Sequence, residues 1–195
     1  MVVDAKILKK EKLHLRDALS EEQQEQYSYR ITEQLLQLDL FQRAETVFVY
    51  VDFRSEVKTH SLILQMQSLG KNVVVPVTLL RERDLLPVRI TSLEDDLAPG
   101  YASILEPVEA IRNTNCVSPE SIDIIVLPGS VFDEHGGRMG YGGGFYDRFV
   151  SQKAPQALRI GLCYELQIVP EAPLQDHDER MDVIVTEKRI INALR

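Results

Sequence analysis

The chain has 195 residues, a size that fits one folded domain. Apolar residues make up 44% of it and charged residues 27%, which excludes a disordered or fibrous protein. The formal net charge of −8 argues against a nucleic-acid partner, because such proteins carry a basic surplus or stripe.

The first part of the chain predicts two helices. Residues 6–19 alternate charged and apolar side chains at helical spacing. The basic residues of this segment are Lys6, Lys9, Lys10, Lys12 and Arg16. Ser20 and Gln23 form a capping-box pattern, so a second helix is expected to begin there and to run to about Leu38.

A strand–helix–strand unit follows. Residues 46–51 and 72–77 are short apolar runs rich in β-branched side chains, which is typical of strands. Residues 59–69 have helical spacing, and Gly70 fits the end of that helix. This order predicts a parallel strand pair with a right-handed crossover, and residues 86–91 form a further candidate strand.

The second half of the chain continues the same alternation. Residues 92–118 lack a clear period, and a connection of that length is usually functional or carries structure of its own. Strands are expected at 122–127, 158–163 and 181–186, and a helix at 144–152. The sum predicts a three-layer α/β fold, with a mostly parallel sheet and helices on both faces, in an isomerase/CoA-transferase-like architecture. Folds of this class bind ligands outside the carboxyl ends of their strands.

The two cysteines, the N-terminal segment and the lengths of the apolar runs indicate the protein's compartment. Cys116 and Cys163 share no metal or redox spacing, and both are expected to be small buried residues. The charged N-terminal segment does not fit a secretory signal, and the apolar runs are far shorter than a membrane span. We therefore expect a cytoplasmic monomer with no membrane partner.

The most informative stretch, residues 127–149, lies between a predicted strand and a predicted helix. It reads LPGSVFDEHGGRMGYGGGFYDRF and holds six glycines after Gly129. Glycines let backbone N–H groups approach an anion, a helix N-terminus favours negative charge, and Arg138 offers a forked donor. These residues predict a phosphate cradle, with a plain tight turn as the alternative. The stretch is not a Walker loop, since no Gly-Lys-Ser/Thr follows the glycines.

The run FDEHGGRMGYGGGFYDRF closely resembles the signature of the 5-formyltetrahydrofolate cyclo-ligase family, also called methenyltetrahydrofolate synthetases. The resemblance extends to Glu56 with Thr59, Val75-Pro76-Val77, Leu105-Glu106-Pro107, Gln167 with Pro170, and His177-Asp178. It covers most of the chain and implies one domain over residues 1–195.

The resemblance implies an enzyme that uses MgATP to convert 5-formyltetrahydrofolate into 5,10-methenyltetrahydrofolate, with a phosphorylated formyl group as the intermediate and ADP and phosphate as the other products. It implies catalytic roles for Arg138 and Tyr146. The ATP-binding residues that it implies are Lys6, Lys9, Lys10, Arg138, Met139, Gly140, Tyr141, Gly142, Gly143, Gly144, Phe145 and Tyr146. Many members have Lys followed by Leu-Arg near the N-terminus, where this chain has Leu8-Lys9, so Lys6 and Lys10 are equal choices there.

The folate and metal contacts are likewise carried over from the resemblance. The implied substrate-binding residues are Val51, Glu56, Tyr141, Gly142, Gly143, Gly144 and Phe145. Phe145 stands where many members have Tyr. Asp147 and Asp178 are the implied Mg²⁺ ligands. The alternatives are that Asp147 is a helix-surface charge paired with Arg148, and that Asp178 is a solvated loop acid.

Two other functions stay open from the sequence. A sugar-phosphate isomerase-like enzyme would need a carboxylate base and no ATP, and the long glycine-rich signature argues against it. A non-catalytic binder of folate or nucleotide would keep the pocket and would not consume ATP.

Overall fold

The computed structural model describes residues 4–175 and 178–193, so His177 lies outside the described residues. The largest sheet in these ranges has seven strands in the order β12-β11-β9-β6-β1-β2-β3. Their bounds are Thr46–Val49 (β1), Asn72–Leu79 (β2), Asp84–Ile90 (β3), Ile124–Leu127 (β6), Leu158–Leu162 (β9), Val183–Val185 (β11) and Ile190–Asn192 (β12). The five inner strands run parallel, and the two edge strands, β3 and β12, run antiparallel to their neighbours. The predicted mostly parallel sheet is confirmed.

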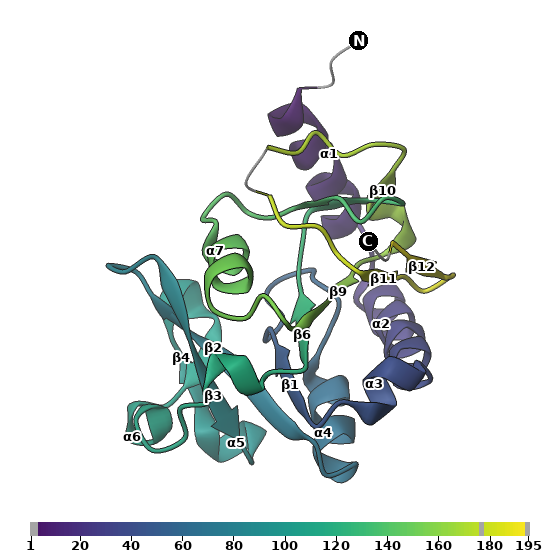
Figure 1. Cartoon of the computed structure of the whole chain (residues 1–195). Coiled ribbons are helices and arrows are strands. Elements are labelled where there is room, and N and C mark those ends of the chain that lie inside the picture. Colours follow the sequence, from purple (N-terminus) through teal and green to yellow (C-terminus); the bar gives the residue numbers. More distant parts are fainter. Residues whose placement is uncertain (1–3, 176–177, 194–195) are drawn as a thin grey trace.

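Both faces of this sheet are buried. Neighbouring side chains along a strand point to opposite faces, so one strand contributes to two cores. In β1, Val47 and Val49 pack into one core and Phe48 into the other. The first core is covered by α2 (Glu21–Leu36), α3 (Asp39–Arg43) and α4 (His60–Ser68), and the second by α7 (Phe145–Gln152). Figure 1 shows α7 on one side of the strands and α2, α3 and α4 on the other. The fold is therefore the predicted three-layer α/β arrangement.

The helix boundaries follow local signals. Both bonds of the Ser20–Gln23 capping box are present at the start of α2. This helix ends at Leu36 instead of the predicted Leu38, because Leu38 is extended and precedes α3. Gly70 has a φ of +75° just after α4, and the Lys71 amide donates to the Met66 carbonyl, which is the Schellman arrangement.

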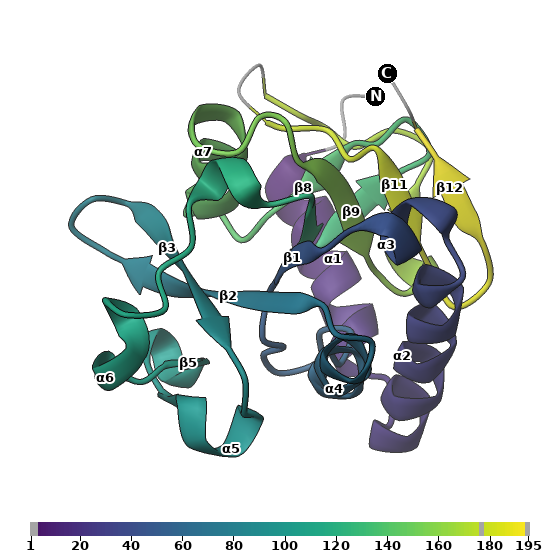
Figure 2. The same cartoon turned by 60° about the horizontal axis from the view of Figure 1, so that its bottom comes forward.

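The long segment without a readable period forms a small subdomain beside β3. It contains α5 (Leu93–Asp96), the hairpin of β4 (Leu97–Pro99) and β5 (Leu105–Pro107), and α6 (Glu109–Arg112). A short 3-10 turn, Tyr101–Ser103, connects the two hairpin strands. In Figure 2 these elements group together beyond β2 and β3. The hairpin carries Tyr101 and Ile104 to the cavity described below.

A second, three-stranded sheet holds the signature segment. It consists of β7 (Val131–Asp133), β8 (Arg138–Met139) and β10 (Ile168–Val169). The N-terminal helix α1 (Ala5–Asp17) lies against β7 and a 3-10 turn, Glu165–Gln167. The Lys12 ammonium donates to the carbonyl oxygens of Leu166 (2.7 Å) and Ile168 (3.3 Å). These contacts fix α1 beside the signature segment.

The two cysteines differ. Cys163 is buried, as predicted, but the prediction for Cys116 is wrong, because it is exposed. Cys116 lies in an irregular segment at the edge of the sheet, where it forms an isolated bridge to Val88 of edge strand β3. None of the helices in the two described ranges has the length and apolar character that crossing a bilayer requires.

Candidate active site

A cavity of about 430 Å³ opens at the carboxyl ends of the central strands. Tyr50 and Val51 follow β1, Pro128 follows β6, and Thr78 lies near the end of β2. In the sheet, β1 lies between β2 and β6. The chain passes from β1 to β2 on one side, while β6 lies on the other side of β1, so the strand order reverses at β1. Such a reversal separates the connecting segments and is where open α/β sheets bind ligands.

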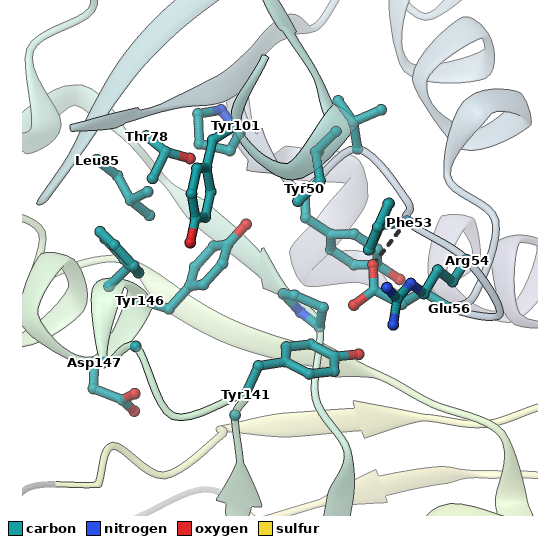
Figure 3. A pocket seen from close by; sticks show the side chains of 18 of the residues that line it. Tyr50, Phe53, Arg54, Glu56, Thr78, Leu85, Tyr101, Tyr141, Tyr146 and Asp147 are labelled. Atoms are coloured by element: carbon teal, nitrogen blue, oxygen red, sulfur yellow. Dashed lines mark hydrogen bonds between the residues drawn. The ribbon is translucent and has the colours of Figure 1, made fainter. Parts of the chain in front are cut away.

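The signature loop forms one wall of this cavity. After β8 the chain turns through residues 140–144 and enters α7, with Gly144 as its N-cap at a φ of +65°. That left-handed conformation favours glycine, since other residues pay a steric penalty there. The members of the segment that line the cavity are Gly140, Tyr141, Gly143, Gly144, Phe145, Tyr146 and Asp147. Figure 3 shows Tyr146 and Asp147 at one side of the cavity and Phe53 and Glu56 at the other.

Arg138 and Asp147 form a buried ion pair in this wall. The Arg138 side chain is 2% exposed, and its Nη2 donates to Asp147 Oδ1 at 2.6 Å. Its Nη1 donates to the Pro128 carbonyl at 3.1 Å. Arg148 instead donates to the carbonyls of Arg83 and Gly143, so the alternative that pairs Asp147 with Arg148 is wrong. The fork of Arg138 thus holds the start of α7 against the end of β6.

Glu56 is a buried carboxylate at the opposite wall, with 7% of its surface exposed. Its Oε2 accepts a hydrogen bond from the Phe53 amide at 2.9 Å (Figure 3). Burial raises the pKa of Glu56, and the nearby Tyr141 hydroxyl, the Phe53 N–H and the Arg16 guanidinium offset part of that rise. A carboxylate held in this way can accept hydrogen bonds from a ligand with an N–H edge.

Arg16 is a site residue that the sequence analysis placed only in a basic cluster. It is 3% exposed and lines the cavity. Its Nε donates to Ser55 Oγ at 3.0 Å, and its Nη1 donates to the Tyr141 hydroxyl at 2.6 Å. A sequence signal existed, because Leu8, Lys12 and Arg16 follow one another at four-residue spacing and so share one face of α1. Leu8 packs into a small apolar cluster and Lys12 binds backbone carbonyls, so this face points inward.

The three predicted ATP-binding lysines lie in an adjoining hollow on α1. Lys6, Lys9 and Lys10 line it together with Leu13, His14 and Asp17, and it also measures about 430 Å³. Leu13 and Asp17 line both spaces, so the two are neighbours. Lys9 Nζ lies 5.7 Å from the centroid of the Tyr141 ring, and partial burial lowers the pKa of Lys9. The structure thus brings positive charge to the edge of the signature loop.

Two of the predicted contacts lie off the cavity wall. Met139 packs with the apolar cluster of Val131, Val169 and Ala172. Gly142 is exposed, and a Cβ added there would lie 3.9 Å from Lys9 Nζ, so it faces the lysine hollow.

The two predicted metal ligands differ in position. Asp147 lines the cavity, and its Oδ1 accepts from Arg138 and, at 3.3 Å, from the Glu179 amide. Asp178 precedes Glu179 in the chain, and its Oδ2 accepts from the Gln175 amide. Within the described residues, no group of three or more His, Cys, Asp or Glu side chains could hold a metal. The donors present fit Mg²⁺, which takes one or two carboxylates and completes its shell with phosphate and water oxygens.

The fold and the site together define an α/β enzyme with a small-molecule cavity at the carboxyl ends of its strands. A statistical model of the 5-formyltetrahydrofolate cyclo-ligase family matches residues 3–187. The chain belongs to this family, which confirms the family predicted from the signature.

Individual relatives agree with this assignment. The 5-formyltetrahydrofolate cyclo-ligase of Escherichia coli (strain K12) is 28% identical over 176 residues, which is 90% of this chain and 96% of that protein. The mouse protein of the same name is also 28% identical over 176 residues, or 87% of each chain. The solution structure of Aquifex aeolicus 5,10-methenyltetrahydrofolate synthetase matches with a TM-score of 0.84 at 31% identity, covering 97% of this chain and 92% of that one.

Proposed function

We propose that this protein catalyses the ATP- and Mg²⁺-dependent cyclisation of 5-formyltetrahydrofolate to 5,10-methenyltetrahydrofolate, with release of ADP and phosphate. Family membership supports the reaction. The observation that carries the site assignment is one cavity whose opposite walls hold the Arg138–Asp147 pair and the buried Glu56. One wall suits phosphate chemistry, and the other suits a heterocycle with N–H donors.

The proposed chemistry activates a poor leaving group. The formyl oxygen attacks the terminal phosphorus of ATP, its new O–P bond forms, and the bond from that phosphorus to ADP breaks. Nitrogen 10 of the folate then attacks the formyl carbon and loses its proton, the C–O bond breaks, and phosphate departs with the oxygen. Phosphoryl transfer of this kind depends mainly on positioning and charge neutralisation.

The residues proposed for the phosphates are those of the signature loop together with cationic side chains around it. Gly143 and Gly144 line the cavity just before α7 begins, and Arg16 and Lys9 flank Tyr141. Arg138 fixes Asp147, which with Asp178 would hold Mg²⁺. When bound, this ion neutralises phosphate charge. Tyr146 lines the cavity next to Asp147 and is proposed to contact the reacting groups.

The residues proposed for the folate come from both walls of the cavity. Glu56 would accept hydrogen bonds from the N–H edge of the pterin ring. Val51, Tyr141 and Phe145 line the same cavity and would pack against the ring system, with aromatic faces available for stacking. We also propose that residues 1–195 act as a single-domain cytoplasmic monomer whose partners are these two small molecules.

The test is a turnover assay with purified protein. 5-Formyltetrahydrofolate, ATP and Mg²⁺ are mixed with the protein, and methenyltetrahydrofolate is followed by its near-ultraviolet absorbance. Product that forms only with ATP supports the proposal. Folate binding without product would favour a non-catalytic binder, and absence of both would favour an isomerase-like enzyme.

A further inference from the structure

Residues 178–182 form a segment beside the site that hydrogen-bonds to the β7–β8 turn and to strand β9. The Met181 amide donates to the Gly136 carbonyl at 2.7 Å, and Arg180 Nη1 donates to the His135 carbonyl at 3.0 Å. The Asp182 amide donates to the Arg159 carbonyl at 2.9 Å. The segment thus crosses from the β7–β8 turn to strand β9 along a fixed path.

Arg159 of β9 is the central anchor of this segment. Its own amide donates to Asp182 Oδ2 at 2.8 Å, so its backbone holds one end of the segment by two bonds. Its side chain is 5% exposed, and Nη1 lies 2.6 Å from Glu179 Oε2. Arg159 pairs in register with Ile125, whose side chain packs with Phe149 of α7, so the guanidinium lies on the α7 face of the sheet.

The segment reaches the proposed metal ligand through its backbone. The Glu179 amide donates to Asp147 Oδ1, the same oxygen that accepts from Arg138. The side chain of Glu179 is therefore held by Arg159 while its backbone holds Asp147. Because the guanidinium is almost fully buried, it needs the carboxylate of Glu179 as a counter-ion, and the attraction between the two charges restricts where the Glu179 amide lies.

We propose that Arg159 and Glu179 are positioning residues that orient the Asp147 carboxylate for Mg²⁺–nucleotide binding. The inference rests on the proposed function. In this arrangement Asp147 is held from two sides, by Arg138 from β8 and by the Glu179 amide from the 178–182 segment. Loss of the second donor leaves the carboxylate to follow Arg138 alone. Groups that orient a metal ligand in this way typically control about 10–100-fold in metal affinity or activity.

The experiment compares Glu179→Gln with a matched control, Glu134→Gln. Both variants remove the negative charge from a Glu–Arg ion pair of similar length, 2.6 Å for Glu179 and 2.7 Å for Glu134, but the Glu134–Arg189 pair is exposed and on the surface. Binding of Mn²⁺ in the presence of a non-hydrolysable ATP analogue is measured by electron paramagnetic resonance. Hydrogen exchange of the peptide covering residues 178–182 and steady-state kinetics with each substrate complete the set.

For Glu179→Gln we expect Mn²⁺ affinity to fall by about tenfold or more. We also expect faster exchange in the 178–182 peptide and a KM for ATP that rises more than the KM for 5-formyltetrahydrofolate. Arg159→Lys keeps the positive charge and should recover part of the Mn²⁺ affinity that Arg159→Met loses. The inference is overturned if a folded Glu179→Gln protein binds Mn²⁺ like the wild type, or if both KM values rise equally. A wild-type protein without turnover would count against the proposed function, while the Mn²⁺ and exchange measurements would still decide the role of the pair.

Discussion

Replacing Asp147 with alanine tests how strongly the site depends on one ion pair. The Arg138 side chain is 2% exposed, the Asp147 side chain 13%, and the two charged atoms lie 2.6 Å apart. Removing the carboxylate leaves a buried guanidinium without its counter-ion, which costs about 3–5 kcal/mol. For a chain of 195 residues, that corresponds to a fall in Tm of about 6–20 °C. Turnover should be nearly abolished even where the variant is folded, because Asp147 is also a proposed metal ligand.

A double-mutant cycle separates the two roles. Arg138→Met combined with Asp147→Ala removes both charges, so no unpaired charge stays buried, and the double variant should be more stable than Asp147→Ala alone. The assay is urea unfolding of the wild type, both single variants and the double variant, followed by circular dichroism. Strictly additive losses, or an Asp147→Ala protein as stable as the wild type, would refute the reasoning.

Three further changes give separate expectations. Burial raises the pKa of Glu56 above its ordinary 4.5. The protonated form of Glu56 therefore stabilises the fold at low pH, and this stability should be lost as the pH rises through the raised pKa. In urea unfolding measured across pH, Glu56→Gln should remove this pH-dependent loss. Lys9→Ala should raise the KM for ATP about two- to fivefold, since a partly exposed charge contributes up to about 1 kcal/mol, whereas Lys58→Ala, which breaks a surface ion pair, should leave it unchanged. Gly144→Ala places a side chain at a φ of +65° and should lower stability by about 1–2 kcal/mol in thermal unfolding.

Each of these expectations has a contrary result. If Glu56→Gln leaves the pH dependence of stability unaltered, burial does not raise the pKa of Glu56. Equal KM values for the two lysine variants would remove Lys9 from the nucleotide site. A Gly144→Ala protein as stable as the wild type would mean that the turn into α7 relaxes without cost.

The parallel core of the fold was predictable because its strands carry their own signal. β1, β2, β6 and β11 are rich in β-branched or aliphatic residues, and β9 is aliphatic apart from Arg159 and Gly161. Such runs are typical of strands buried on both faces. The two- and three-residue strands β7, β8, β10 and β12 were missed, since their pairing depends on partners elsewhere in the chain and leaves no local period. Helix starts were read correctly where the cap is local, as at Ser20.

The site was predictable where one continuous motif forms it. The signature segment and Glu56 were identified, and the structure brings them to one cavity. The burial of Arg16 was not predicted, because its partners Ser55 and Tyr141 lie 39 and 125 residues away in the chain. Glu179 was missed for the same reason, since it lies in an irregular segment and its ion partner Arg159 is 20 residues earlier, on β9.

The contacts that hold α1 in place have a consequence for the order in which the protein is synthesised and folded. Lys12 is fastened to the carbonyls of Leu166 and Ile168, which the ribosome adds more than 150 residues later. Chains are synthesised from the N-terminus, so the first helix emerges long before the surface on which it rests. Until Gly129 and Tyr141 have also been made, Arg16 lacks the carbonyl and the hydroxyl to which its Nη1 donates. A nascent chain stalled before residue 166 would therefore carry α1 without the two carbonyl groups that hold Lys12 in the folded protein.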